Sequence, residues 1–206
     1  MLHYYSLFVL LCCTSVLSNT NKTTNLIVQS TRDAVVYLSK FGYNPCSDST
    51  GFQCSFDLKS ILKIFQERFR LKITGILDDA TKQEMSRSRC GNKDPPLSFS
   101  TNIARPLGLK WSRSTLTWSL RNYSPRIGAA ESQSIIQQAF DAWSQHIPLD
   151  VKRVCSTCSA NIVIDFGYGD HGDGYHFDGP SGTLAHAYYP EDGRIHFDMD
   201  EPWTNR

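Results

Sequence analysis

Four of the six histidines lie close together in the C-terminal part of this sequence. They fall within 26 residues of one another and are His171, His176, His186 and His196. The surrounding segment, Asp165–Glu201, also carries nine of the 20 acidic residues. Imidazole nitrogen and carboxylate oxygen are ligands that Zn²⁺ prefers in a tetrahedral site. The sequence therefore predicts a metal site, although spacing alone does not choose between Asp173 and His176 as a ligand.

The segment Tyr168–Ser181 is rich in glycine and predicts a loop that bends sharply. Ca²⁺ binds six to eight oxygen atoms, which carboxylates and loop carbonyls supply together. The run Asp178-Gly179-Pro180-Ser181 can turn carbonyl groups inward, and Asp198 and Glu201 can add carboxylates. A solvated acidic loop is the alternative interpretation, but such a loop has no need of two histidines on facing strands.

The N-terminus predicts export from the cell. Leu7–Leu17 is an apolar stretch followed by small and polar residues, which is typical of a signal peptide over residues 1–18. A buried N-terminal helix is the alternative. Sequons at Asn21 and Asn122 support export. The apolar run is too short to predict a membrane anchor, and 21 Lys+Arg against 20 Asp+Glu give no basic excess for nucleic acid.

Five cysteines remain after the signal peptide, so at least one thiol is left over if the others pair. Cys46 and Cys54 flank a loop rich in Ser, Asp and Gly, which they can close as a disulfide. The run Cys155-Ser156-Thr157-Cys158 fits a local bridge, a redox pair or half of a zinc knuckle. A knuckle is not expected because the chain has no second CxxC. Cys90 is then the leftover thiol, unless it pairs with Cys155 or Cys158.

Two kinds of pattern divide the rest of the chain. Residues 25–91 carry apolar residues at helical spacing and predict a small bundle of three short helices. Residues 92–106 contain Pro95, Pro96 and Pro106 among small polar residues and predict a linker. Residues 107–206 predict a mixed twisted sheet with a long helix packed across it, with strands at 115–120, 161–166, 184–189 and 194–198 and a helix at 130–146. The expected fold class is α+β.

Several separate motifs, in the same order along the chain, resemble those of the matrix metalloproteinases, a family of zinc endopeptidase zymogens. Lys110-Trp111 and Leu116-Thr117-Trp118 resemble the opening strand of the family's catalytic domain, and Arg89-Cys90-Gly91 with Asp94 resembles its cysteine switch. The helices upstream resemble a peptidoglycan-binding-like propeptide. The remaining motifs are Asp170-His171-Gly172-Asp173, Phe177-Asp178-Gly179-Pro180, Leu184-Ala185-His186-Ala187 and His196-Phe197-Asp198-Met199-Asp200-Glu201.

This resemblance implies a role for each matching position. The structural zinc would be bound by His171, Asp173, His186 and His196. A calcium ion would be bound by Asp178, Gly179, Ser181, Thr183, Asp198 and Glu201. Cys90, with Arg89 and Asp94 holding its loop, would be the inhibitory cysteine that occupies the open position of a catalytic zinc. Thiolate is a strong zinc ligand, which fits that role.

The implied protein is a secreted, latent zinc metalloendopeptidase that acts on extracellular matrix proteins. Its zincin-type catalytic domain would occupy residues 107–206, after an activation linker at 92–106. The predicted zinc site has four protein ligands and is therefore closed, whereas catalysis needs an open position. No HExxH occurs in the 206 residues, so we expect this domain to be truncated before its catalytic helix and to be inactive.

The resemblance implies two kinds of partner, and the sequence leaves one alternative function open. At full length we expect matrix protein substrates and tissue-inhibitor-type proteins as partners, with no nucleic acid and no membrane anchor. The alternative is a non-catalytic secreted protein that binds zinc and calcium and acts as a decoy or binding protein.

Overall fold

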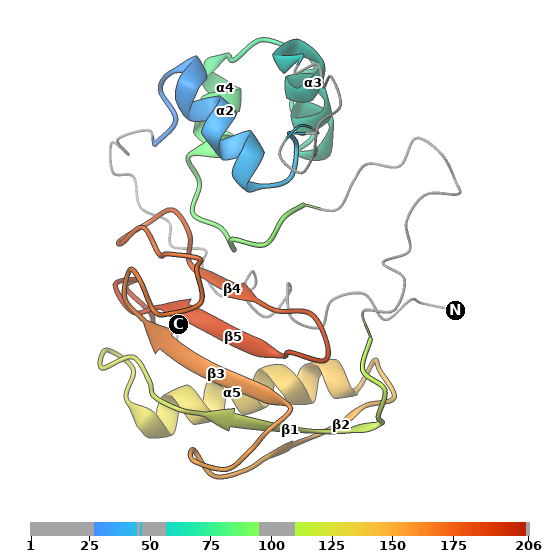
Figure 1. Ribbon diagram of the computed structural model, residues 1–206, viewed down its shortest axis with the longest axis vertical. Helices are drawn as coiled ribbons and strands as arrows, with labels where there is room; N and C mark the ends of the chain where they lie inside the picture. The colour runs from blue at the N-terminus through green and yellow to red at the C-terminus, as the bar shows by residue number, and fades with distance from the viewer. Residues whose placement is uncertain (1–26, 45, 47–56, 95–109, 205–206) are drawn as a thin grey trace. The chain divides into compact units, whose positions relative to one another are not determined.

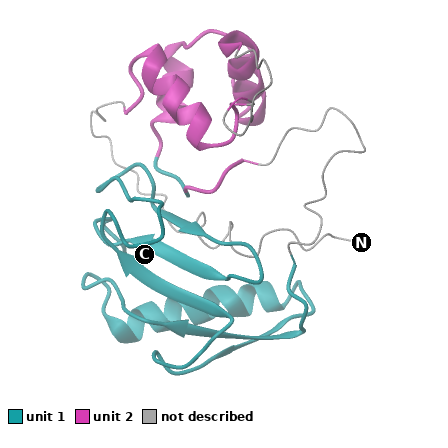
Figure 2. Ribbon diagram, in the orientation of Figure 1, with its two compact units in different colours: residues 1–18, 88–90, 106–206 teal, residues 19–87, 91–105 magenta. Residues whose placement is uncertain are grey.

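The computed structural model describes residues 27–44, 46, 57–94 and 110–204. The predicted signal peptide at 1–18, Cys54 and most of the predicted linker lie outside these residues. The chain divides into two compact units (Figure 2), and one contains residues 88–90 and 110–204 of the described part. The other contains residues 27–44, 46, 57–87 and 91–94. Among the described residues, no helix is both long enough and apolar enough to cross a membrane.

The described residues of the helical unit form three helices, as the apolar spacing predicts. They are α2 (Thr31–Lys40), α3 (Leu58–Arg68) and α4 (Asp79–Met85). Each begins after a residue whose side chain accepts a hydrogen bond from a backbone N–H of the first turn, namely Ser30, Asp57 and Asp78. Such caps satisfy N–H groups that a helix start leaves without partners. The buried core is Val28, Ala34, Leu38, Ile61, Leu62, Phe65 and Met85.

The other unit is a five-stranded sheet with one long helix, α5 (Ala129–Ser144), on one of its faces (Figure 1). The strand order is β2-β1-β3-β5-β4, and only β4 runs antiparallel to its neighbour. The strands are β1 (Thr115–Leu120), β2 (Asp150–Arg153), β3 (Ile162–Gly167), β4 (Ala185–Ala187) and β5 (Arg194–Asp198). The expected α+β fold class is confirmed, although β2 was not anticipated.

The core of the sheet unit lies between α5 and the strands. The rings of Trp118 in β1 and Phe140 in α5 are 5.5 Å apart, and both residues are fully buried. Ile164 and Ile195 face each other across β3 and β5 in the same core. Because side chains alternate along a strand, His196 points away from α5. The opposite face of the sheet is therefore the one that carries the histidines.

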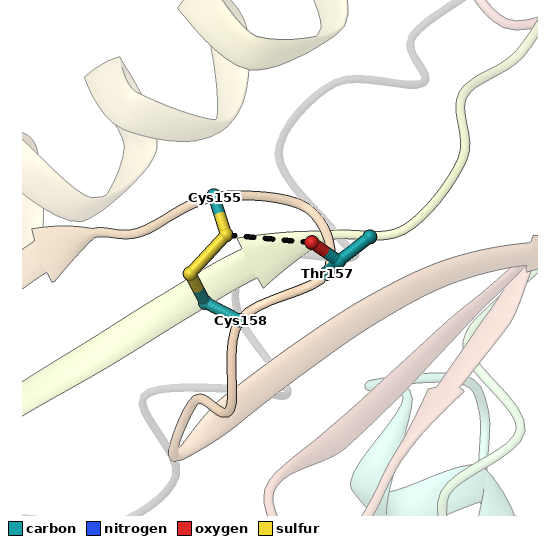
Figure 3. Close-up of a disulfide and its surroundings, with 3 residues drawn as sticks. All are labelled: Cys155, Thr157 and Cys158. Atoms are coloured by element: carbon teal, nitrogen blue, oxygen red, sulfur yellow. Dashed lines mark hydrogen bonds between the residues drawn. A yellow bond between two sulfur atoms is a disulfide. The ribbon is translucent and has the colours of Figure 1, made fainter.

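The state of the cysteines decides two of the alternatives that the sequence left open. Cys155 and Cys158 form a disulfide across the turn that follows β2 (Figure 3), and Cys90 is a buried thiol. The alternative pairing of Cys90 with either of them is therefore wrong, as is half of a zinc knuckle at this turn. Cys46 is disulfide-bonded, which agrees with the loop closure that the sequence suggested, but Cys54 lies outside the described residues.

Candidate metal centre

Four potential ligand atoms converge on the face of the sheet away from α5. His186 of β4 and His196 of β5 lie directly opposite each other in the antiparallel register. The loop that follows β3 brings His171 and Asp173 to the same point. All four ligand atoms lie within 4.8 Å of one another. The loop thus completes a site of which the two strands provide half.

The distances between these atoms fit the tetrahedral coordination of one metal ion. Oδ2 of Asp173 lies 2.7 Å from Nε2 of His186, 2.7 Å from Nδ1 of His196 and 3.1 Å from Nε2 of His171. Nε2 of His186 lies 3.2 Å from Nε2 of His171 and 3.1 Å from Nδ1 of His196. A tetrahedral zinc with bonds of about 2.0–2.1 Å sets its ligand atoms about 3.3 Å apart. Three imidazoles and one carboxylate are also a donor set that zinc prefers, so these residues fit the ion.

Burial changes the pKa of two of these histidines. It lowers the pKa of His186 and that of His196, and the neighbouring imidazoles add to this shift while Asp173 opposes it. Burial raises the pKa of Asp173, but hydrogen bonds from the Tyr175 N–H and from the surrounding side chains outweigh it and hold that pKa well below its usual range. Neutral imidazoles and an ionised carboxylate are the forms that bind a metal.

His176 does not belong to this cluster. Its imidazole is exposed, and its nearest charged partner is Asp170, with Nδ1 and Oδ1 3.8 Å apart. The sequence left open whether Asp173 or His176 joins the other histidines, and the structure places Asp173 among them.

A second group of acidic residues lies at the end of β5. Oδ1 of Asp178 accepts a hydrogen bond of 2.8 Å from the N–H of Thr183. Asp198 and Glu201 are almost completely buried. In each of them one buried carboxylate oxygen, Oδ2 of Asp198 and Oε1 of Glu201, has no hydrogen-bond partner within the described part of the chain.

The electrostatics of this second group favour a cation. Burial raises the pKa of Asp198 and raises that of Glu201 to about 7, and repulsion among Asp178, Asp198 and Asp200 adds to both shifts. Buried carboxylates of like charge are costly unless a cation neutralises them. The loop is shaped around Asp178, because Gly182 has a φ of +79° and a Cβ there would lie 2.6 Å from Oδ2 of Asp178. These residues fit the oxygen-rich site that calcium requires.

Cys90 lies beside the edge of the sheet unit, with the residue before it paired to the chain that leads into β4. The N–H of Arg89 donates to the carbonyl of Gly182 at 2.8 Å, and the N–H of Leu184 donates to the carbonyl of Arg89 at 2.9 Å. The buried Cys90 side chain packs against Ala185 and Phe197.

Asp94, the third residue of the predicted switch, belongs to the helical unit. Its Oδ2 accepts a hydrogen bond of 2.7 Å from the hydroxyl of Tyr43, and its N–H donates to the carbonyl of Phe41 at 3.0 Å. The pairing of Arg89 with Asp94 stays a prediction.

Tyr188 contacts the four-residue candidate metal site, and the sequence did not indicate this contact. Its hydroxyl donates a hydrogen bond of 3.0 Å to Oδ2 of Asp173. Burial and the nearby carboxylate raise the pKa of Tyr188 to about 12, so its hydroxyl stays protonated as a donor. The sequence signal is partial: Tyr188 follows His186 by two residues, which places both on the same face of the chain but does not predict the hydrogen bond.

Comparison with known proteins gives a consistent set of relatives. Residues 110–206 match the Matrixin family. The chain is 38% identical over 177 residues to Matrix metalloproteinase-C of Caenorhabditis elegans, covering 82% of this chain and 30% of that protein. It is 38% identical over 183 residues to Matrix metalloproteinase-17 of Homo sapiens, covering 84% of this chain and 30% of that protein. It is 37% identical over 180 residues to Metalloendoproteinase 1-MMP of Arabidopsis thaliana, covering 81% of this chain and 49% of that protein. The aligned region thus spans 30% to 49% of the length of these relatives.

Proposed function

The chain belongs to the matrixin family, and we propose that it comprises the propeptide and part of the catalytic domain of a secreted, latent zinc metalloendopeptidase. The observation that carries this proposal is the convergence of His171, Asp173, His186 and His196 on one point. Extracellular matrix proteins are the proposed substrates, and tissue-inhibitor-type proteins are proposed partners of the whole enzyme.

These four residues would hold a structural zinc. A zinc ion held by all four residues would cross-link β4, β5 and the loop after β3. The chain's own residues contribute preoriented imidazoles and a fixed carboxylate. We assign no catalytic step to them, because the 206 residues contain no HExxH.

Zinc stoichiometry and stability test this site together. We expect the 206-residue chain to bind one zinc at this cluster, and His186→Ala to lose that zinc and to melt at a lower temperature. Binding to the folded state alone stabilises it by mass action, so the two losses should occur together. His176→Ala is the matched control, because His176 is exposed and outside the cluster. Unchanged zinc content in His186→Ala would refute the ligand assignment.

We propose that the second group binds calcium through the Asp178, Asp198 and Glu201 carboxylates and the carbonyls of Gly179, Ser181 and Thr183. The buried carboxylate oxygens without partners support this site. Calcium should raise the melting temperature of the wild-type chain and should have a much smaller effect on Asp198→Asn. An equal rise in both proteins would exclude Asp198 as a ligand.

We propose that Cys90 is the inhibitory cysteine of the whole enzyme. Cys90 is buried next to the β-bridge that Arg89 forms with Thr183. This supports the role, because the thiol is held at the edge of the sheet unit and is withheld from solvent. In a longer form that contains HExxHxxGxxH, Cys90→Ser should raise peptide cleavage before any processing of the linker. No rise would contradict the switch.

The second candidate function is a secreted protein that binds metal and a partner without catalysis. Sequencing the transcript beyond the codon for Arg206 separates the two. Codons for HExxHxxGxxH within a few dozen positions would support the peptidase, whereas a stop codon would support the binding protein.

A further inference from the structure

Tyr188 and Arg194 form the next cross-strand pair beyond two of the proposed zinc ligands. His186 faces His196 in the antiparallel register of β4 and β5. The N–H of Tyr188 donates to the carbonyl of Arg194 at 2.9 Å, which extends this pairing past the end of β4. Because side chains alternate along a strand, Tyr188 and Arg194 lie on the same face as the two histidines.

The hydroxyl of Tyr188 contacts the oxygen of Asp173 that faces the ligand cluster. That oxygen, Oδ2, receives the hydroxyl at 3.0 Å and lies 2.7 Å from the nearest nitrogens of His186 and His196. The other oxygen, Oδ1, accepts the N–H of Tyr175 at 2.9 Å. The carboxylate is therefore held at both oxygens, and its Oδ2 is fixed toward the histidines.

Arg194 in turn fixes the ring of Tyr188. The guanidinium carbon of Arg194 lies 4.1 Å from the ring centroid, a cation–π contact. Asp192 holds that guanidinium by two hydrogen bonds, from Nε to Oδ1 at 2.7 Å and from Nη2 to Oδ2 at 2.8 Å. Paired hydrogen bonds of this kind restrict the plane of the guanidinium, so the tyrosine ring has a fixed surface to stack on.

We propose that Tyr188 is a positioning residue of the zinc site, which orients Asp173 through its hydroxyl while Arg194 and Asp192 hold its ring. This inference rests on the proposed structural zinc. Partners that orient a metal ligand commonly change metal affinity by about 10- to 100-fold when removed. The spacing His-x-Tyr, which begins in β4 and ends just after it, and the spacing Asp-x-Arg-x-His, which leads into β5, place these groups together.

The test is zinc affinity of the 206-residue chain, measured with zinc alone against a chromophoric competitor. Tyr188→Phe removes the hydroxyl and keeps the ring for Arg194, so we expect affinity to fall about 10- to 100-fold. Tyr189→Phe is the matched control, because that neighbouring ring is 45% exposed. Arg194→Lys, which loses the planar stack, should lower affinity by a smaller factor.

Two further readouts separate positioning from a merely structural role. The metal-free Tyr188→Phe protein should unfold as cooperatively as the metal-free wild type, so that a loss of zinc affinity is not a loss of folding. With Co²⁺ in place of zinc, its visible absorption should change in intensity and position, because that spectrum reports the ligand geometry. Normal absorption and normal zinc affinity in Tyr188→Phe, with zinc binding in the wild type, would overturn the role of Tyr188 alone. A wild type that binds no zinc would overturn the proposed function and this role together.

Discussion

The side chains of Gln66 and Thr81 join α3 to α4 inside the helical unit. Nε2 of Gln66 donates to the Thr81 hydroxyl at 2.9 Å, and neither residue is exposed. The same amide nitrogen donates to the carbonyl of Ile76, while the amide oxygen accepts the N–H groups of Thr74 and Gly75 at 2.9 and 2.8 Å. One buried side chain thus provides hydrogen-bond partners for the backbone groups of the turn that leads into α4.

Replacing Gln66 by Leu should lower the free energy of unfolding by about 2–4 kcal/mol. The loss follows because several buried polar groups are left without partners, at about 1–3 kcal/mol for each group that stays unsatisfied. Chemical denaturation of the chain, followed by helical circular dichroism, measures this change. Gln83→Leu is the control, since that exposed glutamine in α4 should give a change below about 0.5 kcal/mol. Equal effects of the two substitutions would show that the network contributes nothing.

The cap of α4 should make stability depend on acid pH. Asp78 accepts hydrogen bonds from the hydroxyl and N–H of Thr81, which lower its pKa below the usual value although burial opposes the shift. A carboxyl with a lowered folded pKa stabilises the protein above its unfolded pKa and loses that contribution as the pH falls through the folded pKa.

Asp78→Ala should therefore cost about 1 kcal/mol at pH 7, and the difference from wild type should shrink as the pH falls below about 4. Denaturant titrations at several pH values measure it. Asp79→Ala is the neighbouring control, because that side chain is fully exposed and should give a small difference. A wild-type advantage that stays constant down to pH 2 would contradict the role of the charged cap.

Much of the fold follows from local patterns. The apolar spacing over residues 25–91 predicts the three short helices, and the patterns after residue 107 predict a long helix at 130–146 and a strand at 161–166, close to α5 and β3. The strand β2 was missed because Asp150–Arg153 alternates only weakly, with Val151 as its single buried residue. It forms because it pairs in parallel with β1, an interaction between segments that are distant in the sequence.

The candidate site was predictable in composition but not in its supporting contacts. The histidine spacing and the family motifs indicated the four residues that the structure brings together. They did not indicate the hydrogen bond from Tyr188, because it depends on how the loop that carries Asp173 folds back over β4. Such contacts depend on the cross-strand register and on the path of the loop, and neither can be predicted from the local sequence.

The disulfide between Cys155 and Cys158 should contribute only modestly to stability. It closes a turn of four residues that the Cys158 N–H already closes by donating to the Cys155 carbonyl at 3.1 Å. A short loop constrains the unfolded chain little, so the double substitution of both cysteines by serine should cost about 2 kcal/mol or less. Thermal unfolding measures it, with Ser156→Ala as the control in the same turn. A loss of folding would mean that the bond holds more than this turn.

The glycine beside Asp178 should be far less tolerant of a side chain than a glycine of similar backbone conformation. Gly182 and Gly172 have φ values of +79° and +84°, so alanine is strained at both, by about 1–2 kcal/mol. A Cβ at Gly172 meets nothing within 4 Å, whereas one at Gly182 lies 2.6 Å from Oδ2 of Asp178. Gly182→Ala should therefore destabilise the chain clearly more than Gly172→Ala, and it should also reduce the rise in melting temperature that we expect calcium to produce. Equal losses in the two variants would show that Asp178 can move away without cost, which would contradict a fixed position for it in the proposed calcium site.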